Sequence, residues 1–199
     1  MITIHSIVEG HGDAEAVPIV LKRIAASLVP RPEFKLGEAI RTKKSKLIKS
    51  EDGELERIIK LLAGKTTGKA IIVCIIDSDK MCPKIDSVPL LKRMESTRPD
   101  IPKSLVLAHR TFEAWYVAAA ESLRGKCGLK EDFQTIDNLE LGRGHKEYIS
   151  DAKINGCYNP VIDQPAFAKV FDLQQARRAS SFDKLFRDMI RIFSQLNRE

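Results

Sequence analysis

Apolar and polar positions along the chain follow two periodicities, and their order predicts the fold class. Runs of β-branched and aliphatic residues are typical of buried strands at 2–8, 70–76 and 104–109, with a weaker candidate at 33–41. Apolar positions at helical spacing predict helices at 13–28, 54–62, 86–95 and 112–123. Strands that alternate with helices indicate an α/β fold with an open, mainly parallel sheet flanked by helices.

The run at 70–76 is the clearest strand. Six of its seven residues are apolar aliphatic and the seventh is Cys74, so we expect burial on both faces of the sheet. Beyond this α/β core, at 1–124, the pattern becomes loop-rich and helical. The last helix, at 182–196, carries one apolar stripe. We therefore expect a helical extension at 125–199 that packs on the core, giving one structural domain overall.

Acidic residues follow two of the predicted strands. The first strand ends in VEGHGD, which contains Glu9 and Asp13, and we expect Asp13 to be the N-cap of the first helix. The third strand ends in Asp77, Ser78 and Asp79. Alternation along a strand would place Asp77 and Asp79 on one side and Ser78 on the other.

Ligands of open parallel sheets bind at the carboxyl ends of the strands. If the two strand ends are neighbours, Glu9, Asp77 and Asp79 gather at one edge. Three close carboxylates repel one another unless a cation lies among them. Oxygen-only ligands suit Mg²⁺ or Mn²⁺ better than zinc. The pattern therefore predicts a divalent-metal site.

These two acidic motifs resemble the two signatures of the TOPRIM fold, which occurs in bacterial primases, topoisomerases and OLD-type nucleases. Along almost its full length, the chain also resembles the bacterial, TOPRIM-like domain-of-unknown-function family 4276. The matching stretches are VEGHGDAEAVPIVLKRI, DSD followed by CP, FEAWYVAAAESLRG, DQPAF and SSFDKLFRD.

The resemblance implies a TOPRIM-like sheet and Mg²⁺-dependent phosphoryl transfer, as in a nuclease acting on DNA or RNA, with a role in phage defence. Glu9 would be a general acid/base or a metal-linked carboxylate. Asp77 and Asp79 would hold the metal against a phosphodiester oxygen. Gly10 and Gly12 would let the backbone approach phosphate closely.

The chain departs from the family pattern at three positions. Lys80 and Met81 stand where we expect acidic residues, and Thr111 stands two residues before Glu113 in place of an acid. Glu113 is a further metal-ligand candidate, together with His109 at the end of the fourth strand. Lys80 directly follows Asp79, so its ammonium group could neutralise a bound phosphate in place of the metal.

Two features point to a polyanionic partner. The net charge is +6 and the pI is about 9.1. A basic segment at 41–49, expected as a loop after the second strand, offers the candidate phosphate contacts Arg41, Lys43, Lys44 and Lys46, although a solvated charge run has the same pattern. His11 in the glycine loop, and Arg143 and Lys146 in GRGHKEY, are further candidates.

Two other functional classes remain open. A non-catalytic TOPRIM-like module that binds nucleic acid or a partner protein, such as a protein of a defence system, is favoured by Lys80, Met81 and Thr111. The DxD after an apolar strand also resembles a haloacid-dehalogenase-like phosphatase, with Asp77 as the nucleophile. In that fold, however, the strand that carries the nucleophile normally stands near the amino terminus of the domain.

Cysteine spacing and hydropathy indicate the cellular compartment in which we expect the protein. The four cysteines are scattered without a CxxC pair, so no structural zinc site is predicted. No apolar run approaches the roughly 20 residues that span a bilayer, and no signal-peptide pattern opens the chain. We expect a cytoplasmic protein, and the sequence leaves the oligomeric state open.

Overall fold

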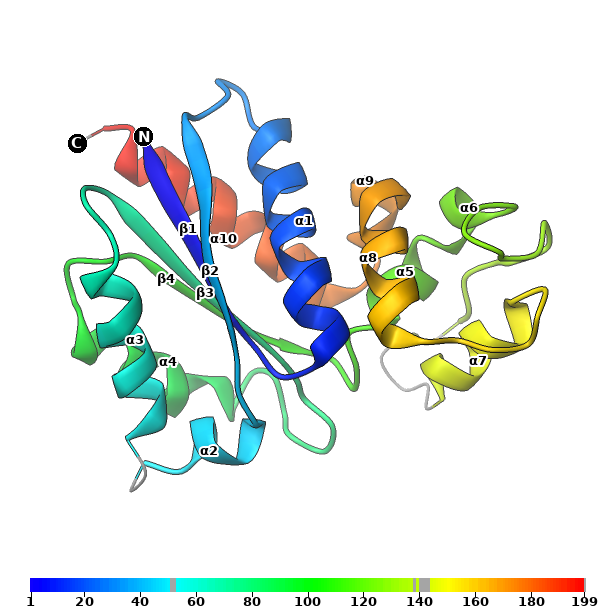
Figure 1. Ribbon diagram of the computed structural model, residues 1–199, viewed down its shortest axis with the longest axis horizontal. Helices are drawn as coiled ribbons and strands as arrows, with labels where there is room; N and C mark the ends of the chain where they lie inside the picture. Colours follow the sequence, from blue (N-terminus) through cyan, green and yellow to red (C-terminus); the bar gives the residue numbers. More distant parts are fainter. Residues whose placement is uncertain (51–52, 138, 140–143, 199) are drawn as a thin grey trace.

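Four parallel strands form the centre of the protein in a computed structural model, which describes residues 1–199 apart from 51–52, 138, 140–143 and 199. The strands are β1 (Ile2–Val8), β2 (Phe34–Arg41), β3 (Ala70–Asp77) and β4 (Lys103–Ala108), in the order β2-β1-β3-β4. All neighbouring strands are parallel. The sheet is open and helices flank it (Figure 1), which confirms the predicted α/β fold class.

Helices connect the strands and continue after β4. The first four are α1 (His11–Ser27), α2 (Lys44–Ile48), α3 (Glu54–Gly64) and α4 (Ser87–Thr97). After β4 follow α5 (Ala114–Ala118), α6 (Ala120–Leu123), α7 (His145–Ala152), α8 (Pro160–Val170), α9 (Leu173–Ala176) and α10 (Ser180–Leu196).

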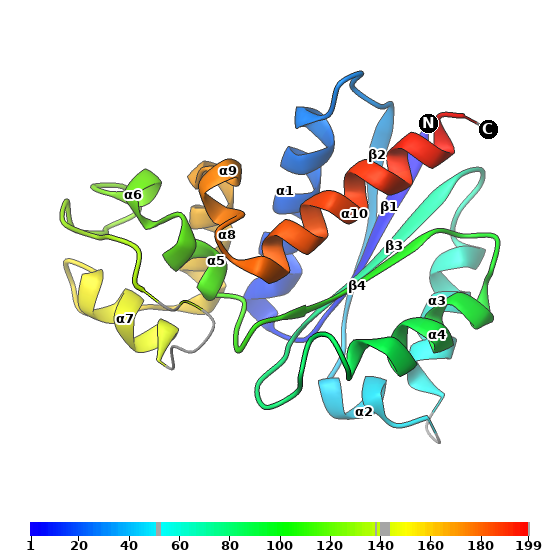
Figure 2. The ribbon, with the colours of Figure 1, turned by 180° about the vertical axis from the view of Figure 1, so that it is seen from behind.

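The two faces of the sheet are covered by different helices, because side chains alternate along each strand. In β3, Ile71, Val73 and Ile75 pack in one core with α1 and α10. Ile72, Cys74 and Ile76 pack in a second core with α3 and α4. Figure 2 shows α10 crossing the sheet on the face that also carries α1. The continuous apolarity of this strand thus reflects burial on both faces, as predicted.

The C-terminal segment shares a core with the sheet. Helix α8 packs along α1, and its Phe167, together with Phe171, stacks edge-on against the buried Tyr116. Helix α10 packs against β4 and buries Phe182, Leu185 and the rest of its apolar stripe. The aromatic residues of the FEAWY segment are fully buried.

Three local predictions are wrong. The basic segment after β2 is not a simple loop, because Leu47 is buried and residues 44–48 form α2. The helix predicted at 112–123 breaks at Ala119, where the backbone leaves the helical region, and becomes α5 and α6. Asp13 is not the N-cap of α1. Gly10 is, and Asp13 caps the helix from its third position by accepting a hydrogen bond from the Gly10 N–H.

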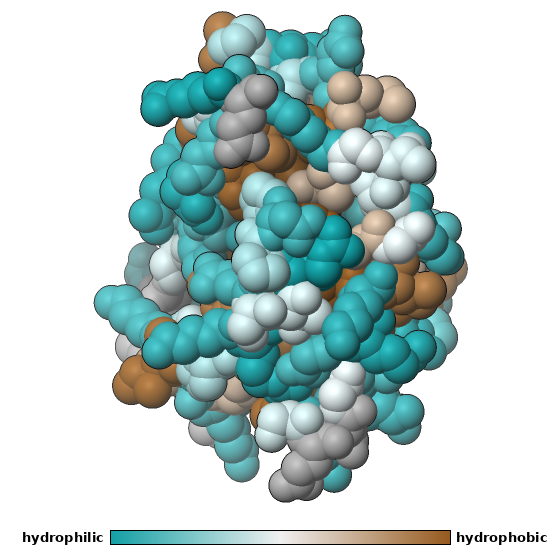
Figure 3. Space-filling model, turned by 90° about the vertical axis from the view of Figure 1, so that its left-hand side faces the viewer, coloured by the Kyte–Doolittle hydropathy of each residue, from teal (hydrophilic) through white to brown (hydrophobic). Residues whose placement is uncertain are grey.

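The face of the molecule that carries α3 and α4 is predominantly polar. Figure 3 shows the side that carries α3 and α4, where hydrophilic residues cover most of the face and apolar areas lie between them. Within the described ranges, no helix has both the length and the apolar character needed to cross a membrane.

Candidate functional site

The ends of β1 and β3 lie side by side. Val8 pairs with Ile75, so Glu9 follows the end of one strand and Asp77 ends its neighbour. A pocket of about 390 Å³ opens at this edge. It is lined by five acids and seven other residues: Glu9, Asp13, Asp77, Asp79, Glu113, Gly10, His11, Gly12, Lys146, Pro160, Val161 and Gln164. The structure therefore gathers the predicted acids at one pocket.

Asp77 and Asp79 reach this pocket by different geometry. The Asp77 carboxylate accepts a 2.7 Å hydrogen bond from the Phe112 backbone N–H, which fixes its direction. The strand ends at Asp77, and Asp79 has φ of 50°, in the left-handed region. The predicted strand alternation therefore stops before Asp79, whose side chain is 60% exposed. Ser78 is buried, and its hydroxyl accepts a hydrogen bond from the Arg110 N–H.

Glu113 is the most deeply buried acid of the pocket, with 1% of its surface exposed. One carboxylate oxygen accepts hydrogen bonds of 3.1 Å from the Tyr158 hydroxyl and from the Gln164 side-chain amide. The other oxygen has no hydrogen-bond partner, and the same is true of Gln164 Oε1 and of Glu9 Oε2. Buried oxygens without partners are costly, so these three acceptors are suited to a ligand that accepts their lone pairs.

Burial and mutual repulsion make the negative charge of this pocket unfavourable. Burial is the main cause that raises the pKa of Asp77 well above its ordinary value, and the nearby Glu113 and Asp13 raise it further. Burial likewise raises the pKa of Asp13, with Glu113 adding to the shift, and that of Glu9, which Lys44 partly offsets. A bound cation would relieve this cost.

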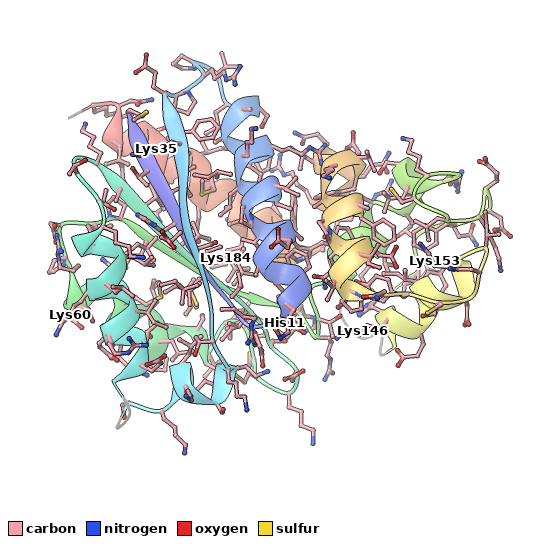
Figure 4. All side chains as sticks on the ribbon, viewed as in Figure 1. His11, Lys35, Lys60, Lys146, Lys153 and Lys184 are labelled. Atoms are coloured by element: carbon pink, nitrogen blue, oxygen red, sulfur yellow. The ribbon has the colours of Figure 1, made fainter. Side chains whose placement is uncertain are left out.

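Two lysines already approach the acids. Lys44 Nζ donates a 2.9 Å hydrogen bond to the Asp77 carbonyl, contacts the Asp79 carboxylate and lies 3.9 Å from Glu9 Oε2. Lys146 Nζ lies 3.8 Å from Glu113 Oε1 on a side chain that is half exposed. Figure 4 places Lys146 close to His11, near the start of α1. The acidic pocket is therefore partly neutralised by the chain itself.

The donor set of the pocket fits Mg²⁺ or Mn²⁺. Its five carboxyl groups and the Gln164 amide offer oxygens, several of which are buried, and unpartnered acceptors are among them. Across the part of the chain that the structure describes, however, no three Asp, Glu, His or Cys side chains converge tightly enough to hold a metal ion. Mg²⁺ commonly keeps several waters and needs only one or two carboxylates, so this arrangement is compatible with such an ion.

Several predicted site residues lie elsewhere. Arg41, Lys43, Lys46 and Lys80 are exposed and do not belong to the pocket lining given above. Lys44 is half-buried and does not line the pocket either; its ammonium group contacts the Asp77 carbonyl and the Asp79 carboxylate. Among the predicted phosphate contacts, Gly10, His11, Gly12 and Lys146 do line the pocket. His109 does not line it, and Arg143 lies outside the described residues.

The structure explains why Gly10 and Gly12 of VEGHGD lack side chains, and this explanation differs from the predicted approach to phosphate. A side chain at Gly12 would overlap the Pro160 carbonyl and the Gln164 side chain of α8. A Cβ at Gly10 would come within 2.7 Å of the Asp13 carboxylate that caps α1. Both glycines therefore allow contacts within the protein, and their predicted approach to phosphate stays a prediction.

Sequence reasoning missed the contribution of α8. Pro160, Val161 and Gln164 form one wall of the pocket, and Asp13 is an additional buried acid within it. The DQPAF stretch contains Gln164 but has no periodicity that signals a site. For Asp13, its place three residues after Gly10 was the sequence signal that could have assigned it to the site.

Comparison of the chain with known protein families, with curated proteins and with solved structures finds no significant match. The resemblance to TOPRIM-like proteins therefore stays a prediction, and the pocket is the feature of the molecule that bears on function.

Proposed function

We propose that the protein is a divalent-metal-dependent phosphoryl-transfer enzyme, and specifically a nuclease that acts on DNA or RNA. The observation that carries the proposal is the acidic pocket at the carboxyl ends of β1 and β3. There, buried oxygens of Glu113 and Gln164 have no hydrogen-bond partner. A TOPRIM-like family relationship and a role in phage defence are part of the same proposal.

In this proposal Asp77 and Glu113, which hydrogen bonds from the protein position, hold the cation together with Asp79. Glu9 lines the same pocket beside them. A bound Mg²⁺ or Mn²⁺ would neutralise the negative charge of the phosphoryl group during its transfer. Glu9 follows β1, and burial raises the pKa of its carboxyl above the ordinary value; in this proposal it is the general acid/base. His11 and Lys146, both exposed on the pocket wall, contact the phosphate oxygens.

A second candidate is a non-catalytic module that binds nucleic acid or a partner protein. It is favoured by one specific observation: Lys44 and Lys146 approach the acids that a metal would use. The two candidates differ in metal dependence. The module would bind its partner equally well with Mg²⁺ and with a chelator, whereas the nuclease would turn over only with the metal.

The test of the nuclease is cleavage of plasmid DNA and of RNA in the presence of Mg²⁺ or Mn²⁺. We expect Glu9→Gln and Asp77→Asn to reduce the cleavage rate by about 10²-fold or more, because each removes a charged group at the reacting centre. The asparagine at 77 keeps an oxygen that can accept from the Phe112 N–H, so folding should be retained.

Glu15→Gln is the matched control, because Glu15 is exposed on α1 and does not line the pocket. Its cleavage rate should equal that of the parent protein. Cleavage that survives in both acidic-site variants would show that another site is responsible. Lack of cleavage by the parent with every metal and both substrates would rule out the nuclease in favour of the binding module.

A further inference from the structure

Lys44 is held more firmly at the acidic pocket than a surface lysine would be. Its side chain is only 14% exposed. Its ammonium group meets three oxygen-bearing groups at the ends of β1 and β3: the Asp77 carbonyl, the Asp79 carboxylate and, at 3.9 Å, the Glu9 carboxylate. An ammonium group has three N–H donors and no acceptor, so it can serve such a set of oxygens.

The backbone that carries Lys44 is also fixed. Helix α2 is anchored by Leu47, which is 1% exposed. The Arg93 guanidinium donates 3.0 Å hydrogen bonds to the carbonyls of Leu47 and Ile48 and pairs with Glu56. The position of Lys44 beside the strand ends is therefore built into the packing of α2 against α3 and α4.

We propose that Lys44 is an internal counter-ion of the acidic pocket, and that a divalent cation must displace its ammonium group in order to bind near Glu9 and Asp79. This inference depends on the metal site of the proposed function. An ammonium group and a divalent ion repel each other when they share the same carboxylates, so the two cations compete. Lys146 is less suited to be this counter-ion, since its ammonium group lies 3.8 Å from Glu113 Oε1 on a half-exposed side chain.

The exchange would explain why the acids line one pocket yet do not converge. Lys44 contacts the Asp79 carboxylate and the Asp77 carbonyl, while the Phe112 N–H holds the Asp77 carboxylate. Displacement of Lys44 would free Glu9 and Asp79 to turn toward an ion. The metal affinity of the parent is therefore reduced by the cost of removing the lysine.

The test is calorimetric titration of the full chain with Mn²⁺ at pH 7, without nucleic acid. We expect Lys44→Met to bind Mn²⁺ about tenfold more tightly than the parent, because the competing charge has gone. Lys60→Met is the control. It removes one positive charge from an exposed position on α3, which Figure 4 shows far from His11 and Lys146, and its affinity should match that of the parent.

A second readout is stability without metal. Lys44→Met should melt at a lower temperature than the parent in chelator, and Mn²⁺ should abolish this difference. If Lys44→Met does not fold, Lys44→Gln provides the same neutral substitution with a polar side chain. Equal or weaker Mn²⁺ binding by the folded variant overturns the counter-ion inference but leaves the metal site intact. Lack of Mn²⁺ binding by the parent and by all variants overturns both proposals.

Discussion

At the scale of single residues, the pocket depends on two glycines that leave room for contacts within the protein. Gly12 lies where α1 packs against Pro160 and Gln164 of α8, and Gly10 leaves room for the Asp13 carboxylate. The approach of α8 brings Gln164 beside Glu113, and the pair leaves two oxygens without partners. A small residue at position 12 is therefore needed for the wall of the pocket to form.

We predict that Gly12→Ala lowers the free energy of unfolding by about 1–3 kcal/mol, because the added methyl group overlaps the Pro160 carbonyl. Urea denaturation measures this change. The control is Gly64→Ala at the end of α3, where nothing lies within 4 Å of the added Cβ. That variant should equal the parent or gain up to about 1 kcal/mol. Equal stability of the two variants would show that the helices do not approach as closely as described.

At the scale of elements, α8 is held in place by a buried ion pair. Lys153 Nζ donates a 2.7 Å hydrogen bond to Asp163 Oδ1, and each side chain is 8% exposed. The second Asp163 oxygen accepts from the Asn159 N–H at the start of α8. The pair therefore connects the end of α7 to the first turn of α8, which carries the pocket residues Pro160 and Val161.

We predict that Asp163→Asn lowers the free energy of unfolding by about 3–5 kcal/mol, because it leaves the Lys153 ammonium buried without a counter-charge. Thermal or urea denaturation provides the measurement. Asp100→Asn is the control, since it breaks the ion pair with Arg98 on the surface and should change stability little. A loss no larger than that of the control would contradict the structural role assigned to the buried pair.

At the scale of the whole molecule, the sheet was predictable and the closure of the pocket was not. Apolar runs identify strands because residues such as Ile71 and Ile72 must be buried on opposite faces. The acids at 9 and 77 were identified because parallel strands end at the same edge. The contribution of Gln164 depends on the packing of α8 against α1, and no local pattern encodes that long-range contact.

The departure of Asp79 from the strand has a similar cause. Its left-handed backbone is accompanied by hydrogen bonds between the segment after β3 and the segment after β4, including Asp79 N–H to the Arg110 carbonyl. Alternation along the strand carries no information about such a turn. The sequence therefore predicts which acids meet at the pocket, whereas their orientation requires the tertiary structure.

The measurement that tests the central claim most directly is an anomalous-difference map from a crystal of the full chain soaked in Mn²⁺. We predict a peak inside the pocket lined by Glu9, Asp77 and Glu113, with carboxylate oxygens as its protein ligands. The same crystal form of Asp77→Asn should show that peak greatly weakened. An empty pocket at saturating Mn²⁺, with Lys44 still bound to Asp79, would contradict a metal-dependent function.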